Sequence, residues 1–258
     1  MPDFDVTKPS IARVYDYVLG GKDNFAADRA MAEQVVAMVP SIPPTVRENR
    51  EVVARAVRWA AEAGISQFID LGCGLPTEPS THQSAREIVP GARVAYVDND
   101  PVVINHLMAQ LGKDQETVVV DGDVADTQAI LGKVRGHIDL SRPVCLVIGA
   151  LLHFYDAEAA RDLAGRYTAA LAPGSYCAAS VLAAAPGPDT DQLISFYSSG
   201  THPAYLHSVA DFAGFFGDLD LVPPGVADAR TWRPGWESVP DPDPRGTWMY
   251  AGMGRKNG

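Results

Sequence analysis

The sequence has little cysteine, and its cysteines form no pattern that binds metal or makes disulfides. Its 258 residues include Cys73, Cys145 and Cys177, with no C-x-x-C pair. An odd number of isolated cysteines argues against a disulfide framework and a thiolate zinc site. The six histidines are dispersed without an H-x-x-x-H or H-x-E pair. We therefore expect no metal site.

Long apolar runs and basic charge are also scarce. No stretch approaches 18 uninterrupted apolar residues, and the first ten residues lack a signal-peptide profile. Lys and Arg total 21 against 32 Asp and Glu, a net charge of −11. Such a chain lacks the electrostatic footprint of a nucleic-acid binder. We expect a cytoplasmic protein with neither a nucleic acid nor a membrane as its partner.

What the sequence does have is an alternation of strand-like and helix-like segments. Strands are expected at 66–71, 92–97, 117–120, 143–148, 174–182, 220–222 and 247–252, and helices at 79–89, 101–111, 157–171 and 209–216. The apolar run at 143–148 is typical of a parallel strand covered on both faces. The alternation predicts a doubly wound α/β sheet over a domain at 64–258. Before it, helices expected at 11–19, 26–39 and 46–63 form an N-terminal helical extension over 1–63.

A glycine motif follows the first strand. Asp70 ends the strand, and Gly72 and Gly74 allow the backbone to turn tightly beside a ligand. In open α/β sheets, ligands bind beyond the carboxyl ends of the strands. The motif lacks the third glycine of the dinucleotide fingerprint, and the Asp70 carboxylate would repel a pyrophosphate. A cofactor that carries an ammonium group suits the motif better.

Two more acidic residues follow the next two strands. Asp98 can accept hydrogen bonds from a ribose diol, or it can cap the following helix. Asp123 suits the exocyclic amine of adenine, with Asp121 as the competing choice and helix capping as the alternative for Asp123. An ammonium, a ribose diol and an adenine amine together describe S-adenosylmethionine better than NAD.

These motifs resemble those of the class I S-adenosylmethionine-dependent methyltransferases over about residues 64–258. Residues 10–25, SIARVYDYVLGGKDNF, are similar to the N-terminal hallmark of an actinobacterial methyltransferase family once listed as a domain of unknown function. Residues 75–77, 215–216 and 222–225 are similar to that family too. The resemblance implies an α/β fold: a Rossmann-like, seven-stranded, mostly parallel sheet with helices on both faces.

The resemblance also implies a cofactor, S-adenosyl-L-methionine, with S-adenosyl-L-homocysteine as its product. The cofactor-binding residues expected from the motifs are Asp70, Gly72, Cys73, Gly74, Asp98, Asn99, Asp123 and Val124. Cys73 serves as a small filler between the glycines rather than as a nucleophile, because no adjacent cation lowers its pKa.

The N-terminal run suggests a lid over the cofactor. Gly20-Gly21 supplies a hinge, Tyr15 and Phe25 exclude water, and Arg13 or Lys22 pairs with the methionine carboxylate. The alternative is a static helical hairpin packed against the sheet. The polar residues that open the next helix, Arg47, Asn49 and Arg50, either join the site or are merely solvated.

The segment after the fourth strand is expected to face the transferring methyl group. His153 is a candidate general base, or a structural histidine bonded to the backbone. Tyr197, His202 and Tyr205 form a candidate acceptor wall, or they pack a loop.

The prediction is a methyltransferase that acts on a small-molecule acceptor, mainly through positioning and exclusion of water. The alternatives are a non-catalytic cofactor-binding regulatory protein and an NAD(P)-dependent reductase. The missing glycine and the absence of a Tyr-x-x-x-Lys pair weigh against the reductase.

Overall fold

The computed structural model describes residues 5–183, 203–235 and 249–258. The helices are α1 (Ile11–Leu19), α2 (Ala26–Met38), α3 (Ile42–Glu62), α4 (Thr81–Arg86), α5 (Pro101–Leu111), α6 (Thr127–Val134), α7 (Ala157–Ala169) and α9 (Val209–Gly214), with a short 3₁₀ helix η1 at Leu152–Phe154. The strands are β1 (Gln67–Leu71), β2 (Arg93–Asp98), β3 (Thr117–Asp121), β4 (Cys145–Gly149), β5 (Tyr176–Leu182), β6 (Asp220–Leu221), β7 (Ala227–Asp228) and β8 (Met249–Arg255).

The strands form one mixed sheet, which confirms the predicted doubly wound fold. Its order is β3-β2-β1-β4-β5-β8-β6, with β7 also paired to β8. Strands β1 to β5 are parallel, and β8 runs antiparallel to β5. The strand order reverses between β1 and β4, and at such a switch point the loops that follow the two strands diverge. The sheet has eight strands rather than the expected seven, because the two-residue strand β7 is too short to show an alternating pattern.

Alternate residues of the central strands face opposite sides of the sheet, as the pleat requires. Phe68 on β1 and Val147 on β4 pack with helices α3, α4 and α5 in one buried cluster. Their neighbours Ile69 and Leu146 pack with α6, α7 and α9 in another. Both faces of the central strands are therefore covered by helices, as the apolar sequence of β4 predicts.

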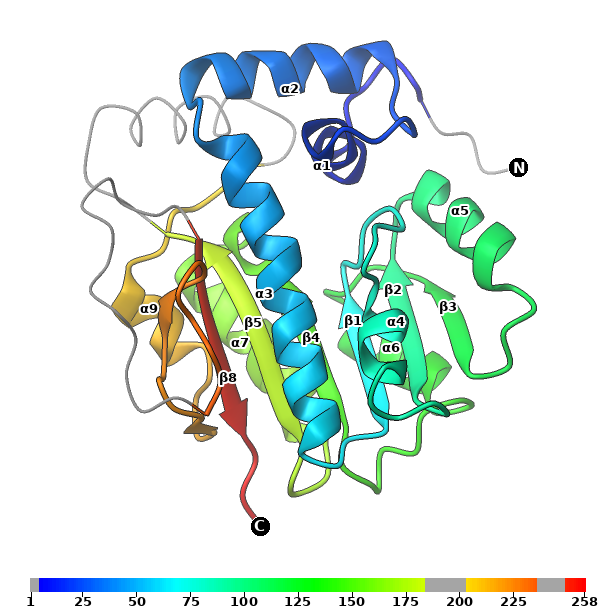
Figure 1. Cartoon of the computed structure of the whole chain (residues 1–258), viewed down its shortest axis with the longest axis vertical. Helices are drawn as coiled ribbons and strands as arrows, with labels where there is room; N and C mark the ends of the chain where they lie inside the picture. Colours follow the sequence, from blue (N-terminus) through cyan, green and yellow to red (C-terminus); the bar gives the residue numbers. More distant parts are fainter. Residues whose placement is uncertain (1–4, 184–202, 236–248) are drawn as a thin grey trace.

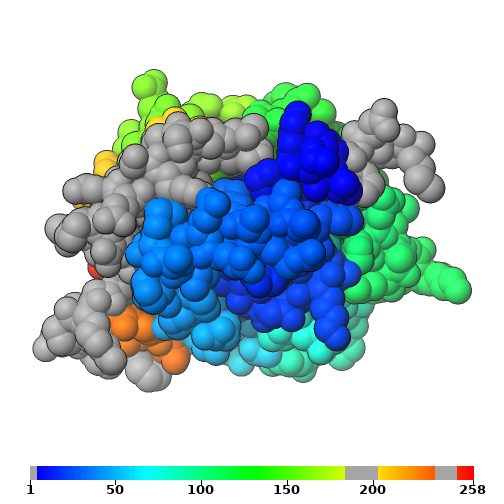
Figure 2. All heavy atoms as spheres, turned by 90° about the horizontal axis from the view of Figure 1, so that it is seen from above, coloured from blue at the N-terminus to red at the C-terminus, as the bar shows by residue number. Residues whose placement is uncertain are grey.

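The N-terminal helices divide between two positions (Figure 1). Helix α3 lies along one face of the sheet and shares its hydrophobic core through residues such as Val57 and Ala60. Helices α1 and α2 lie above the carboxyl ends of the parallel strands, and a view from above shows the N-terminal helices across the centre of the molecule (Figure 2). A separate cluster around Val35, Val39 and Val46 holds α2 to α3. The N-terminal region, which the sequence predicts as an extension, thus contributes α3 to the core and places α1 and α2 over the ends of the strands.

Most element bounds agree with the predictions, and the exceptions have local causes. Helix α3 begins at Ile42 because Pro43 and Pro44 occupy its first turn, where proline is tolerated. Helix α4 begins only at Thr81, because the Ser80 side chain caps it by accepting the Gln83 N–H. Helix α6 is an element that the sequence analysis did not predict. Across the described ranges, none of the helices is both long and apolar enough to span a membrane.

Replacing the fully buried Leu146 by alanine tests the importance of the central strand. We expect Leu146→Ala to lower the free energy of unfolding by about 2–5 kcal/mol, because it leaves a cavity in the core. Leu221→Ala, at a side chain that is 38% exposed, is the control and should change the value by no more than about 0.5 kcal/mol. Denaturant unfolding measures both, and equal losses would contradict this account of the core.

Candidate cofactor-binding site

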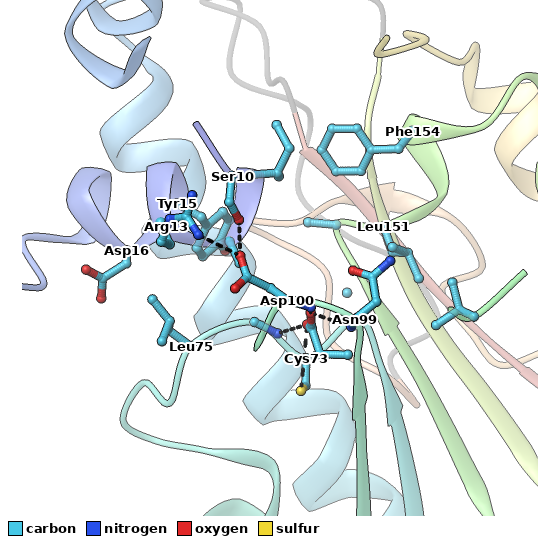
Figure 3. Close-up of a pocket in the computed structure, with 18 of the residues that line it drawn as sticks. Ser10, Arg13, Tyr15, Asp16, Cys73, Leu75, Asn99, Asp100, Leu151 and Phe154 are labelled. Atoms are coloured by element: carbon cyan, nitrogen blue, oxygen red, sulfur yellow. Dashed lines mark hydrogen bonds and ion pairs between the residues drawn. The ribbon is translucent and has the colours of Figure 1, made fainter. Parts of the chain in front are cut away.

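A cavity of about 470 Å³ lies at the carboxyl ends of β1 to β4, beneath α1 (Figure 3). Its lining comes from the N-terminal segment between residues 5 and 16, from Asn49 and Arg50 on α3, and from the loops that follow the four strands, at 72–77, 98–101, 122–124 and 149–155. Because β1 and β4 flank the reversal of strand order, the cavity occupies the place where α/β sheets bind their ligands.

The turn after β1 forms the floor of the cavity. Gly72 and Gly74 have φ angles of +62° and +69°, a left-handed conformation that favours glycine. A Cβ on Gly72 would also lie 2.8 Å from Cδ1 of Leu151, so this turn and the β4 loop approach closely. The N–H groups of Gly72 and Cys73 both donate to the carbonyl of Val97 and tie the turn to β2. Gly72, Cys73 and Gly74 all line the cavity, as the motif predicts.

Asp98 ends β2 beside this turn and contacts the cavity. Its Oδ2 accepts the N–H of Gly74 at 2.9 Å, and its Oδ1 accepts the N–H groups of Asn99 and Asp100, each at 2.9 Å. Burial raises the pKa of this carboxyl above its usual range. Each carboxylate oxygen has two lone pairs, and Oδ2 accepts one backbone N–H and a weak contact of 4.0 Å from the Cys73 thiol, which a hydroxyl donor can replace. Asp98 therefore retains capacity to accept a hydrogen bond from a ligand hydroxyl.

Asp70 lies outside the lining, although the motif predicted it as a contact. Its Oδ2 accepts a hydrogen bond from Thr81 Oγ1 at 2.6 Å, and burial raises its pKa to about 6. The charges of Arg50 and Asp98 also influence that pKa, so Asp70 belongs to the electrostatic environment of the site. Asp70 can therefore affect a charged group in the cavity only through its electrostatic field and not by direct contact.

The loop after β3 distinguishes the two candidate adenine acids. Asp123 and Val124 line the cavity, whereas Asp121 does not. Asp123 Oδ1 accepts the N–H of Ala125 at 2.8 Å, which leaves its other oxygen available. Asn99, from the neighbouring strand end, also lines the cavity (Figure 3).

Arg13 lines the cavity but is committed to protein partners. Its side chain donates from Nε to Asp28 at 2.9 Å, from Nη1 to Asp100 at 3.4 Å and from Nη2 to the Lys8 carbonyl at 2.8 Å. The guanidinium also lies 5.4 Å from the centre of the Phe25 ring. The expectation that Arg13 binds the methionine carboxylate therefore has no support in this geometry.

Two other residues of the expected lid lie away from the cavity. Neither Phe25 nor Lys22 is part of the lining, and Phe25 packs against the buried core instead. Tyr15 does line the cavity, where its hydroxyl donates to the Val46 carbonyl at 3.1 Å and accepts from Asn49 Nδ2 at 2.8 Å. Of the two expected aromatic cover residues, only Tyr15 contacts the cavity.

Arg50 is the cavity-lining arginine with unused donors. Its Nη2 donates to the Thr77 carbonyl at 3.2 Å, while its Nε is buried with no hydrogen-bond partner among the described residues. The buried Nε has no access to the cavity, but an arginine that lines a cavity and keeps terminal N–H groups free can bind a ligand that supplies an acceptor. The sequence indicated Arg50 only as a polar residue near the start of a helix. Its place in the cavity lining is visible only in the fold.

His153 is buried within η1 and is absent from the cavity lining, which instead contains Leu151, Phe154 and Tyr155. Its Nδ1 accepts the N–H of Leu182 at 3.4 Å. Burial, together with the nearby His207, lowers the pKa of His153 to about 3. This placement favours the structural interpretation over the general base.

Of the candidate acceptor wall, the structure describes Tyr205 alone. Tyr205 is 41% exposed, is absent from the lining and donates its N–H to the His153 carbonyl at 2.7 Å. Tyr197 and His202 lie outside the described residues. Within the described ranges, no cluster of three potential metal ligands is present.

The fold is Rossmann-like, and the cavity lies at the switch point of its sheet. A family model described as S-adenosyl methyltransferase matches residues 1–257, and the chain belongs to this family of S-adenosylmethionine-dependent methyltransferases. One similar crystal structure is that of a candidate methyltransferase from Thermobifida fusca YX. Its sequence is 42% identical to this chain, the TM-score is 0.93, and the match covers 100% of this chain and 98% of that one.

Two further structures show how far the similarity extends. A DUF574 family protein from Streptomyces avermitilis is 35% identical with a TM-score of 0.89, and the match covers 98% of this chain and 99% of that one. An O-methyltransferase family protein from Burkholderia thailandensis shares the fold alone, at 16% identity and a TM-score of 0.54 over 97% of this chain and 65% of that one. Among curated proteins, none matches the chain in sequence.

The pKa of His153 generates a prediction about stability. The unfolded chain binds a proton at this histidine below about pH 6.5, whereas the folded chain resists protonation until about pH 3. Stability is therefore lost as the pH falls through this window, by up to about 1.4 kcal/mol per pH unit. His153→Asn should remove this loss, because asparagine does not titrate.

Unfolding free energies measured from pH 7 to pH 4 check the prediction, with His106→Asn as the control. The His106 side chain is 35% exposed and approaches Asp23, so its replacement should leave the loss at His153 intact. A constant difference between wild type and His153→Asn across this range would contradict the assignment.

Proposed function

We propose that this methyltransferase binds S-adenosylmethionine in the cavity above β1 to β4 and transfers its methyl group to a small-molecule acceptor. The observation that carries the proposal is the position of Asp98. Its carboxylate lies at the end of β2 beside a left-handed glycine turn, at the switch point, with capacity to accept one more hydrogen bond. A ribose diol supplies such donors.

The lining residues suggest how the other parts of the cofactor bind. Asn99, Val124 and Leu151 surround the adenine end, where Asp123 would accept a hydrogen bond from the exocyclic amine. Arg50, rather than Arg13, would hold the methionine carboxylate, because it lines the cavity and only its Nη2 is used by a protein acceptor among the described residues. The ammonium would lie in the negative field of the acidic residues below the glycine turn.

The bound cofactor supplies a methyl group activated by the positive charge on sulfur. The chain's own contribution is to orient the reactants and to exclude water from the cavity. Ile11, Ala12 and Tyr15 from α1 cover the cavity, and Phe154 and Tyr155 line its β4 side. With His153 buried elsewhere, these groups position the acceptor without a histidine base.

A cavity of this size, enclosed by the N-terminal segment, supports an acceptor that is a small molecule. The net charge of −11 also disfavours a nucleic-acid acceptor. Release of S-adenosylhomocysteine in the presence of candidate small molecules tests the transfer itself. A protein that binds the cofactor but releases no product with any acceptor would favour the regulatory alternative.

Replacing Asp98 tests the ribose assignment. Each charge-assisted hydrogen bond to the ribose is worth roughly 1.5–3 kcal/mol, so Asp98→Ala should weaken cofactor binding at least about tenfold. Calorimetric titration with S-adenosylhomocysteine measures the effect, and Asp121→Ala, at an exposed acid outside the cavity, is the matched control. A dissociation constant of Asp98→Ala within twofold of wild type would remove Asp98 from the site.

Replacing Arg50 tests the carboxylate assignment separately. Arg50→Gln should weaken S-adenosylhomocysteine by roughly 1.5–3 kcal/mol, because it removes hydrogen bonds to a charged group. Adenosine, which lacks the amino-acid end, should bind the variant and the wild type equally. Arg47→Gln, an exposed arginine on the same helix, is the control. If adenosine binding fell as much as S-adenosylhomocysteine binding, Arg50 would act on the shape of the cavity instead.

A further inference from the structure

Asp100 connects the N-terminal segment to the end of β2. Its Oδ1 accepts the N–H of Val102 at 2.8 Å and caps α5, while its backbone N–H donates to Asp98 Oδ1 at 2.9 Å. Its Oδ2 accepts hydrogen bonds from Ser10 Oγ and from Arg13 Nη1 (Figure 3). Besides capping α5, Asp100 therefore binds two residues of the N-terminal segment.

The N-terminal side of this contact is itself built around one buried carboxylate. Asp28, which is fully buried, accepts hydrogen bonds from the backbone N–H groups of Ser10 and Phe25, at 2.9 and 2.7 Å, and from Arg13 Nε at 2.9 Å. The starts of α1 and α2 are therefore fastened together, and Arg13 joins this unit to Asp100. The side chain of Arg13 is only 5% exposed.

We propose that Ser10 and Arg13 are positioning residues that act through Asp100. They fasten the N-terminal segment across the cavity and hold the loop that carries the Asp98 carboxylate. The inference rests on the proposed function, because it takes Asp98 as the group that binds the ribose. It assigns Arg13 a role in retaining the cofactor without contact to the methionine carboxylate.

The physical reason lies in what must break when the cavity opens. Ser10 and Arg13 line the cavity and also bind Asp100, so moving the segment away separates a buried ion pair. Separation leaves Asp100 without its cation beside Asp98, a second buried carboxylate. Binding of a ligand beneath the segment is therefore energetically coupled to formation of the Arg13–Asp100 ion pair. By linkage, the ligand strengthens the pair by the same factor as the pair strengthens the binding of the ligand.

The test compares Asp100→Asn, Arg13→Gln and Ser10→Ala with wild type in stopped-flow binding of S-adenosylhomocysteine. Asparagine retains an oxygen to cap α5 but removes the charge. We expect Asp100→Asn and Arg13→Gln to weaken binding by about 5–150-fold, the usual range of coupling between sites. The change should lie mainly in a faster dissociation rate, because the segment covers a bound ligand. Ser10→Ala should have a smaller effect in the same direction.

A matched control separates positioning from general stability. Arg86 pairs with Asp114 in another part of the protein, and neither residue lines the cavity. Arg86→Gln should lower the free energy of unfolding while leaving the dissociation rate unchanged. A double-mutant cycle of Arg13→Gln and Asp100→Asn, read by unfolding, should show a larger coupling when S-adenosylhomocysteine is present.

Three results would count against the inference or against its premise. If Arg13→Gln and Asp100→Asn behave like Arg86→Gln, losing stability at an unchanged dissociation rate, the positioning role is wrong. If Arg13→Gln does not fold, an unchanged dissociation rate in both Ser10→Ala and Asp100→Asn would overturn the positioning role instead. If wild type fails to bind S-adenosylhomocysteine, or Asp98→Ala binds it normally, the proposed function fails first.

Discussion

The hydrogen bond from the Gly74 N–H to the Asp98 carboxylate holds together the ends of two parallel strands. It forms because Gly72 and Gly74 turn in the left-handed region and bring a backbone donor to the end of β2. Beside it, the loops that follow β1 and β4 diverge at the reversal of strand order and leave space above the sheet. The floor of the cavity depends on this junction, because the loops after β3 and β4 line the cavity together with it.

The sheet and the floor of the cavity could be predicted from the sequence because their signals are local. An apolar run such as β4 identifies its own burial, and Gly72, Gly74 and Asp98 are read from spacing alone. The roles of Arg13 and His153 could not be read in this way. Whether an arginine has a free donor, or a histidine faces a cavity, depends on partners distant in sequence, such as Asp100 and Leu182.

The N-terminal segment shows why composition alone misleads at such a site. Its aromatic and charged residues suggest a flexible lid that contacts the ligand directly. In the fold, most of that charge is used internally, since Asp28 binds three donors from two helices. Only part of α1 is then available to contact a ligand, through small and apolar residues such as Ala12 and Ile11.

The antiparallel course of β8 has a practical consequence. Because β8 runs opposite to β5, Arg255 lies at the edge of the sheet where the parallel strands begin, opposite the cavity. A fluorophore or an immobilisation tag attached near that end is separated from the ligand by the full length of the strands. The same attachment next to Asp5 would lie at the rim of the cavity. Surface-coupled binding measurements are therefore best made through the β8 end.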